Sequence, residues 1–111
     1  MAGRKAMMGL AIGVGCTSTA EAAELIALIE TSLSACGQAA SSVRLLATIE
    51  HRAAHPAIAA AARHFGAELR GLTAATLSDG VAEPAAQHFG RLLLPKQKSA
   101  HATCAIAELN P

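Results

Sequence analysis

The order of short apolar runs and helical patterns along the chain restricts its fold more than any other feature of the sequence. Five runs have the length and apolar character of buried strands, at 10–14, 43–49, 68–72, 91–94 and 102–109. Helical spacing of apolar residues lies between them, at 18–35, 56–65 and 81–89, with a shorter helix expected at 73–77 and a turn at 78–80. Strands that alternate with helices predict an α/β fold: one domain with a mostly parallel or mixed sheet and helices on both faces.

Local signals predict where the two longer helices begin and end. Ser18 followed by Glu21 fits a capping box, in which a hydroxyl and a carboxylate satisfy free amides at the helix start. Gly37 is a plausible stop for that helix. Pro56 suits the first turn of the next helix because its missing amide has no partner there in any case, and Gly66 is expected to end it.

Length and composition agree with a single domain over residues 1–111, in which residues 1–8 are expected to form a flexible tail. The net charge is +1, and the aromatic side chains are Phe65 and Phe89 alone. Nucleic-acid-binding domains are usually strongly basic or rich in stacking side chains, so we expect no nucleic-acid partner. No apolar stretch approaches the roughly 20 residues of a membrane span, so we expect no membrane partner.

The three cysteines, Cys16, Cys36 and Cys104, are odd in number and widely spaced. This arrangement fits neither a disulfide framework nor a CxxC metal site. We therefore expect reduced thiols in a cytoplasmic protein, with Cys104 in the core. The apolar segment near the N-terminus is interrupted by glycines, which makes it a poor secretion signal.

The first polar segment of interest is the glycine-containing loop expected after the first strand. Gly13 and Gly15 would let a ligand approach the backbone, and Cys16 and Thr17 lead into a helix whose first amides attract anions. Ser18 stands where a dinucleotide-binding fingerprint has its third glycine, so nucleotide binding is disfavoured.

The second segment follows the second strand and contains Glu50, His51, Arg52 and His55. Loops after parallel strands gather at one edge of a sheet, so we expect it near the first loop. The two histidines have the spacing of a helical metal pair, but Pro56 disfavours a helical His55, and we expect no metal. The plain alternatives are a helix cap for His55 and a surface ion pair between Glu50 and Arg52.

The third segment connects the last two apolar runs and contains Lys96, Gln97, Lys98, Ser99 and Thr103. Lysine ammonium groups are compact charges that suit carboxylates or phosphates. A solvated loop would explain the two lysines but not the amide and hydroxyl groups beside them. We therefore interpret this segment as a candidate anion-binding loop.

Segments at the start, middle and end of the chain together carry a family resemblance. They are Ile-Gly-Val-Gly-Cys at 12–16, Leu-Ala-Thr-Ile-Glu at 46–50, and Leu-Pro-Lys-Gln-Lys-Ser at 94–99 with Ala-Thr at 102–103 and Ala-Ile-Ala at 105–107. The chain resembles the CobE family, which is similar to the C-terminal domain of CbiG in cobalamin biosynthesis. It differs from relatives in having Thr17, Ser18 and Thr19 where they often carry arginines, and in a shorter stretch after Leu77.

The resemblance implies a compact α/β domain that takes part in making the corrin ring. The implied ligand is an anionic corrin precursor of the precorrin or hydrogenobyrinic acid type, with no separate cofactor. The residues expected to bind it are Gly13, Gly15, Cys16, Thr17, Glu50, Arg52, Lys96, Gln97, Lys98, Ser99 and Thr103.

Three hypotheses for function remain open at this point. The first is a carrier or stabiliser that binds the corrin precursor without changing it. The second is an enzyme acting on the corrin periphery, such as a precorrin lactone hydrolase, with Glu50 or His51 as the base or Cys16 as a nucleophile of lowered pKa. The third is a module that recruits other cobalamin-pathway enzymes through an alanine-rich helical face.

Overall fold

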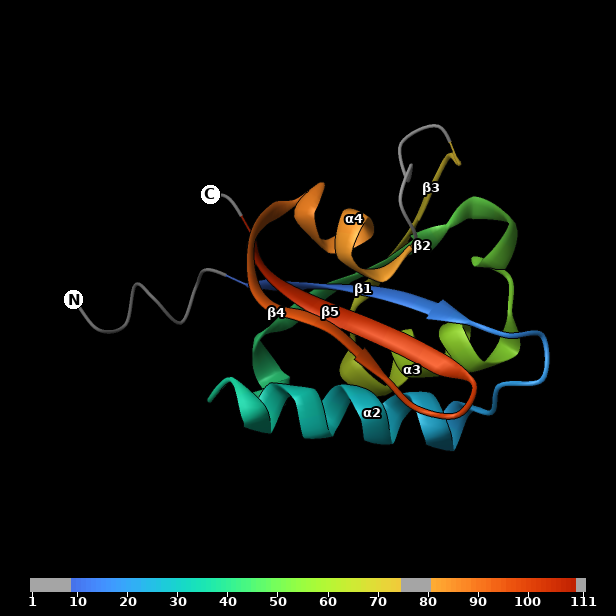
Figure 1. Cartoon of the computed structure of the whole chain (residues 1–111), viewed down its shortest axis with the longest axis horizontal. Coiled ribbons are helices and arrows are strands. Elements are labelled where there is room, and N and C mark those ends of the chain that lie inside the picture. Colours follow the sequence, from blue (N-terminus) through green and yellow to red (C-terminus); the bar gives the residue numbers. More distant parts are fainter. Residues whose placement is uncertain (1–8, 75–80, 110–111) are drawn as a thin grey trace.

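A five-stranded mixed sheet forms the centre of the computed structural model, which describes residues 9–74 and 81–109 (Figure 1). The strands are ordered β3-β2-β1-β5-β4. Along the chain the elements are β1 (Leu10–Cys16), α2 (Ala22–Ala35), η1 (Ala40–Ser42), β2 (Val43–Ile49), η2 (Glu50–Arg52), α3 (Pro56–Phe65), β3 (Glu68–Leu72), α4 (Ala82–Gln87), β4 (Gly90–Lys98) and β5 (Ala102–Leu109). The predicted α/β fold with a mixed sheet and helices on both faces is confirmed.

Half of the sheet is parallel and half is antiparallel. β1 pairs with β2 and β2 with β3 in parallel, whereas β5 is antiparallel to both β1 and β4. β4 and β5 are joined by only three residues, 99–101, and a connection that short can join only antiparallel strands. Of the two predicted forms, mostly parallel or mixed, the sheet has the mixed one, with β1, β2 and β3 as its parallel part.

The predicted strands match the observed ones closely in three cases and run short in two. β2, β3 and β5 have the predicted bounds. β1 continues to Cys16, so Gly15 and Cys16 belong to a strand and not to a loop. β4 continues to Lys98, so the expected lysine loop is the end of an edge strand.

The main core lies between one face of the sheet and helices α2 and α3 (Figure 1). Alternate residues of β1, namely Leu10, Ile12 and Val14, point to this face and are almost fully buried. They meet the apolar stripe of α2, including Leu25 and Ile29. Burial of each such side chain contributes about 1.5–3 kcal/mol, so this layer supplies most of the driving force for folding.

The opposite face of the sheet is covered by α4 and is built from small residues. Ala82, Ala85 and Ala86 of α4 are buried against alanines of the central strands. A Cβ atom added at Gly13 would lie 1.9 Å from the carbonyl oxygen of Ala82 and 2.7 Å from the amide nitrogen of Ala86. Gly13 therefore allows the α4 backbone to lie directly on β1. This close contact explains why glycine occupies position 13.

The helix ends confirm one predicted cap and contradict another. The His55 imidazole caps α3, since its Nδ1 accepts a hydrogen bond from the Ala57 amide at 3.1 Å. Gly66 ends α3 in the left-handed conformation with φ of 63°. The capping box at Ser18 is wrong, because α2 begins at Ala22 and its N-cap, Glu21, makes no side-chain cap bond.

Some expectations fall on parts of the chain that are not described. The tail at 1–8 and the turn at 78–80 lie outside the described residues, as does most of the short helix expected at 73–77. Within residues 9–74 and 81–109, none of the helices has the length and apolar character needed to cross a membrane.

Replacing Gly13 by alanine is expected to destabilise the fold by about 1–3 kcal/mol, because the new methyl group collides with backbone atoms of α4 and the helix must shift. The midpoint of urea unfolding should fall accordingly. Gly15→Ala on the same strand is the matched control, since its Cβ would meet only side-chain atoms, with Thr103 Oγ1 at 2.9 Å and Val81 Cβ at 3.4 Å. Equal midpoints for the two variants would contradict the proposed role of Gly13.

Candidate functional site

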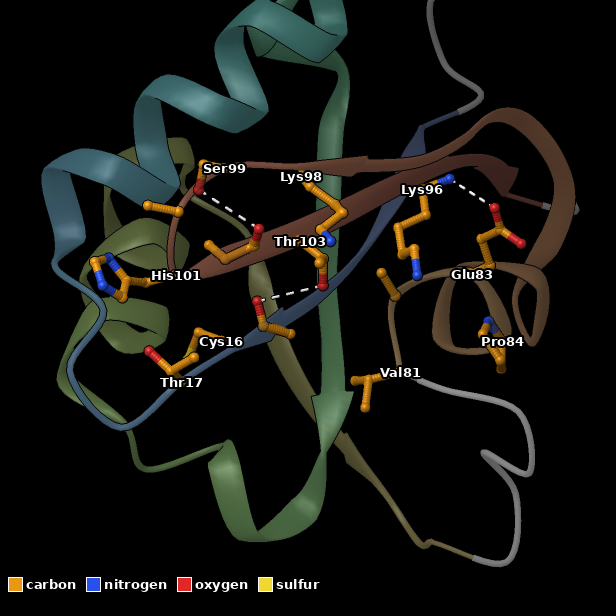
Figure 2. Close-up of a pocket in the computed structure, with 14 residues that line it drawn as sticks. Cys16, Thr17, Val81, Glu83, Pro84, Lys96, Lys98, Ser99, His101 and Thr103 are labelled. Atoms are coloured by element: carbon orange, nitrogen blue, oxygen red, sulfur yellow. Dashed lines mark hydrogen bonds between the residues drawn. The ribbon is translucent and has the colours of Figure 1, made fainter.

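A cavity of about 360 Å³ lies between the end of β1, the start of α4 and the β4–β5 hairpin (Figure 2). One side is basic and polar and comes from the hairpin, while the facing side comes from α4 and is mostly apolar. The lining residues are Gly15, Cys16, Thr17, Val81, Ala82, Glu83, Pro84, Lys96, Lys98, Ser99, Ala100, His101, Ala102 and Thr103.

Lys96 and Lys98 are two residues apart on the edge strand β4, so their side chains point to the same face, and the strand is irregular just before them. Leu94 pairs with Ile106 and Gln97 with Cys104, so β4 advances three residues while β5 advances two. The extra residue is a β-bulge next to Pro95, and bulges commonly redirect side chains at the edge of a sheet. Lys96 and Lys98 both line the cavity, and both are exposed to solvent.

Neither lysine ammonium is neutralised by a carboxylate in the part of the chain that the structure describes. Among residues 9–74 and 81–109, no ion pair within 4.0 Å involves Lys96 or Lys98. The nearby Glu83 carboxylate instead accepts a hydrogen bond from the Lys96 backbone amide at 2.7 Å, which ties α4 to the edge strand. Two positive charges therefore remain available to an anion inside the cavity.

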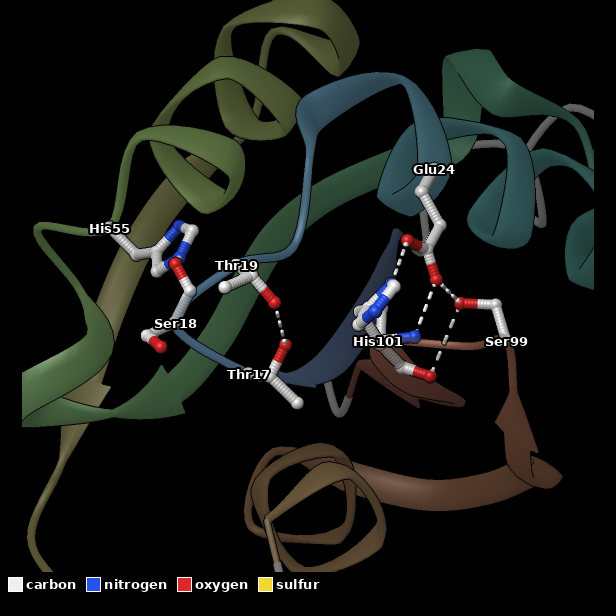
Figure 3. Close-up of polar contacts among 8 residues, drawn as sticks. Thr17, Ser18, Thr19, Glu24, His55, Ser99 and His101 are labelled. Carbon is white, nitrogen blue, oxygen red and sulfur yellow. Dashed lines mark hydrogen bonds and ion pairs between the residues drawn. The ribbon is translucent and has the colours of Figure 1, made fainter.

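The Glu24 carboxylate on α2 fixes the tip of the hairpin (Figure 3). It accepts hydrogen bonds from the Ser99 hydroxyl and from the His101 amide, the latter at 2.6 Å. Its other oxygen lies 3.1 Å from His101 Nδ1, which must carry a proton because a carboxylate can only accept. From the other side, the Thr17 amide donates to the His101 carbonyl at 2.9 Å.

These contacts lower the pKa of Glu24. The Ser99 hydroxyl has the largest effect, followed by the His101 amide, because both stabilise the charged carboxylate. Glu24 therefore holds the cavity wall in place while it is ionised. Among the α2 side chains in the described part of the chain, Glu24 makes the most hydrogen bonds to the β4–β5 hairpin.

The end of β1 contributes backbone and small groups to the cavity. A Cβ atom at Gly15 would lie 2.9 Å from Thr103 Oγ1, so glycine leaves the space open. The Thr103 hydroxyl donates a long hydrogen bond, 3.5 Å, to the Gly15 carbonyl. Burial raises the pKa of Cys16, with Arg52 opposing the shift, so the hypothesis of a nucleophile of lowered pKa is wrong.

The second predicted segment does not line the cavity. Glu50, His51 and Arg52 form the short turn η2 beyond the end of β2, and no ion pair joins Glu50 to Arg52. The segment does meet the first loop, since His55 Nε2 lies 3.1 Å from the Ser18 carbonyl oxygen (Figure 3). In the described part of the chain, no three His, Cys, Asp or Glu side chains gather as a metal site would require.

Seven of the predicted binding residues line the cavity, and four do not. Those that line it are Gly15, Cys16, Thr17, Lys96, Lys98, Ser99 and Thr103. Gly13 is covered by α4, Glu50 and Arg52 lie in η2, and Gln97 turns back on its own strand, where its amide donates to the Pro95 carbonyl at 3.0 Å.

The sequence did not predict that the start of α4 lines the cavity, or that Glu24 holds the tip of the β4–β5 hairpin. Val81, Ala82, Glu83 and Pro84 gave only a helix-start signal, with nothing to place that helix opposite the lysines. Glu24 lies 77 residues from His101 along the chain, and no local pattern connects them.

We expect Glu24→Gln to loosen the hairpin and to weaken the acid dependence of stability. The folded-state pKa of Glu24 is lowered, so its ionised form stabilises the fold above the unfolded-state pKa. That contribution is lost as pH falls through the lower folded-state value. Between pH 7 and pH 3, urea midpoints of the wild-type protein should therefore fall more steeply than those of the variant.

Amide hydrogen exchange gives a local readout of the same change. The His101 amide should exchange faster in Glu24→Gln, and not in Glu30→Gln, which alters a carboxylate on α2 that contacts His64 instead. Unchanged exchange at His101 in Glu24→Gln would show that the carboxylate does not hold the hairpin.

Comparison with known proteins places this chain in a family. The family model described as cobalamin synthesis G C-terminus matches residues 10–107. The curated protein CobE from Sinorhizobium sp. is 40% identical over 126 aligned residues, which cover 93% of this chain and 82% of that protein.

Solved structures of related proteins have the same fold. The crystal structure of CobE, a protein from the cobalamin (vitamin B12) biosynthetic pathway, has a TM-score of 0.81 at 26% identity, covering 93% of this chain and 92% of that one. Cobalamin biosynthesis protein chiG from Agrobacterium tumefaciens has a TM-score of 0.73 at 25% identity, with coverages of 92% and 99%. A putative cobalamin biosynthesis protein G homolog from Sulfolobus solfataricus shares the fold, with a TM-score of 0.77 at 19% identity. This chain is matched over 94% of its length and spans 38% of that longer protein.

The family match spans nearly the whole described chain, and it agrees with the resemblance found in the three sequence segments. The chain therefore belongs to the cobalamin synthesis G C-terminus family, which includes CobE, and is involved in cobalamin biosynthesis.

Proposed function

We propose that this protein binds an anionic corrin-ring precursor, of the precorrin or hydrogenobyrinic acid type, in the cavity beside α4 and acts as its carrier or stabiliser. The observation that carries the proposal is the pair of lysines, Lys96 and Lys98, which face one cavity without an ion-pair partner among the described residues. Corrin precursors are large, flat and decorated with carboxylates, and an unpaired ammonium is a suitable partner for a carboxylate.

The two lysine contacts would supply part of the binding free energy. A hydrogen bond between charged groups contributes about 1.5–3 kcal/mol. Lys96 and Lys98 are exposed before binding, so solvent screening reduces each contribution toward the lower end. Two such contacts contribute about 3 kcal/mol of the roughly 8 kcal/mol that corresponds to micromolar affinity, and apolar contact with Val81 and Pro84 adds to them.

The geometry favours binding over catalysis at this cavity. Glu50 and His51, the bases of the hydrolase hypothesis, lie outside its lining, and the raised pKa of Cys16 disfavours a thiolate there. The recruitment hypothesis is restricted to α2. The alanines Ala61 and Ala62 of α3 and Ala82, Ala85 and Ala86 of α4 are buried within the fold, whereas Ala23, Ala27 and Ala35 of α2 are exposed.

Gel filtration with visible absorbance tests the proposal, using hydrogenobyrinic acid as the ligand. The pigment should co-elute with the wild-type protein, and the affinity should fall at least about tenfold in Lys96→Ala/Lys98→Ala because two charged contacts are lost. Added salt should weaken binding, since exposed charges are screened.

A matched control separates site binding from general charge. Arg63→Ala/Arg91→Ala also removes two positive charges, from α3 and from a part of β4 outside the cavity lining. This variant should bind the pigment nearly as well as the wild-type protein. Failure of the wild-type protein to bind at low salt, or equal losses in both double variants, would overturn the proposal.

A further inference from the structure

We propose that the cavity holds its ligand by a single edge that carries two carboxylates, one for each lysine, and leaves most of the macrocycle in solvent. This inference rests on the proposed function and adds the mode of recognition: which part of the ligand enters, and which part stays accessible. It follows from the size of the cavity, the placement of Lys96 and Lys98, and the nature of the facing wall.

The cavity is too small for a whole corrin precursor. Its volume of about 360 Å³ is near the lower end of the range of about 300–1,000 Å³ for sites that bury drug-sized ligands. A tetrapyrrole ring with its peripheral acid side chains is larger than such ligands. Only a part of the ring can therefore enter, and a flat molecule enters a cleft most readily by its edge.

The two lysines suit two separate carboxylates on that edge. Lys96 and Lys98 are two residues apart on β4 and line the same cavity, so their attachment points are separated by roughly 7 Å at about 3.3 Å per strand residue. An ammonium is a point charge without the fork geometry of arginine. Each lysine is therefore better satisfied by a carboxylate of its own than by sharing one.

The facing wall favours the same orientation. Val81 and Pro84 present apolar surface, which suits the hydrocarbon edge of a ring (Figure 2). Glu83 adds a negative charge on the α4 side, close to the Lys96 backbone, and so repels acid groups from that wall toward the lysine side chains. The ligand's carboxylates are thus directed to β4.

Both phenylalanines of the chain pack against the apolar core clusters of the fold. Phe65 packs against the main core, and Phe89 lies with Leu72 and Val81 near α4, where the Arg70 guanidinium is 5.6 Å from the centre of its ring. The broad face of a macrocycle is usually held by aromatic stacking or by a wide apolar wall, whereas the wall here is narrow. An edge-bound ligand also stays accessible to a second protein before it is released, as a carrier requires.

Fluorescence of a metal-free corrinoid acid, hydrogenobyrinic acid, measures how much of the bound ligand is exposed. Acrylamide is a neutral quencher, so its access to the bound ligand does not depend on the lysine charges. The quenching constant of the bound ligand should keep at least half of its value for the free ligand. A value below half would show an enclosed ligand and overturn edge binding, while the proposed binding function would stand.

Affinity measurements test the two-carboxylate contact. Lys96→Gln and Lys98→Gln should each weaken binding of the corrinoid acid about tenfold. A corrinoid whose peripheral acids are all carboxamides should bind the wild-type protein about a hundredfold more weakly than the acid. A loss in only one variant, or equal affinity for acid and amide, would overturn the inference. If the acid does not bind at all, the proposed function fails together with it.

Discussion

The close approach of α4 to the backbone of β1 is the contact on which the candidate site depends. Gly13 has no side chain to hold the helix away, and Ala82 and Ala86 of the helix are equally small on their side of the contact. Because α4 lies so near the sheet, its first turn, with Val81 and Pro84, comes opposite the β4–β5 hairpin. The cavity exists because these two parts face each other across the end of β1.

The β4–β5 hairpin, which forms the basic side of the cavity, is held in place by hydrogen bonds to α2 and α4. Lys96 and Lys98 share one face of β4 and both line the cavity, and Glu24 fastens the hairpin tip to α2 through Ser99 and the His101 amide. These contacts hold the strand that carries the lysines in one position beside the cavity. A preorganised site loses less entropy when the ligand binds.

The sequence predicted the elements well where their signals are local, and the site only in part. α3 has the expected bounds because Pro56 starts it and a left-handed glycine ends it. The sequence predicts a loop over 95–98, whereas β4 continues to Lys98. An edge strand has a solvated side, so its apolar pattern stops before its backbone pairing does. Gly13 was assigned to a ligand because local sequence cannot tell a ligand from a packed helix. The contact of Glu24 with the hairpin depends on the tertiary fold alone.

Nuclear magnetic resonance of the isotope-labelled protein, titrated with hydrogenobyrinic acid, tests the central claim most directly because it locates the site residue by residue. The account predicts that the largest amide shift changes fall at 15–17, 81–83 and 96–103, which surround the cavity, with small changes in η2 at Glu50–Arg52. Changes that cluster in η2, or the absence of any change at millimolar ligand, would contradict the assignment of the cavity as the ligand site.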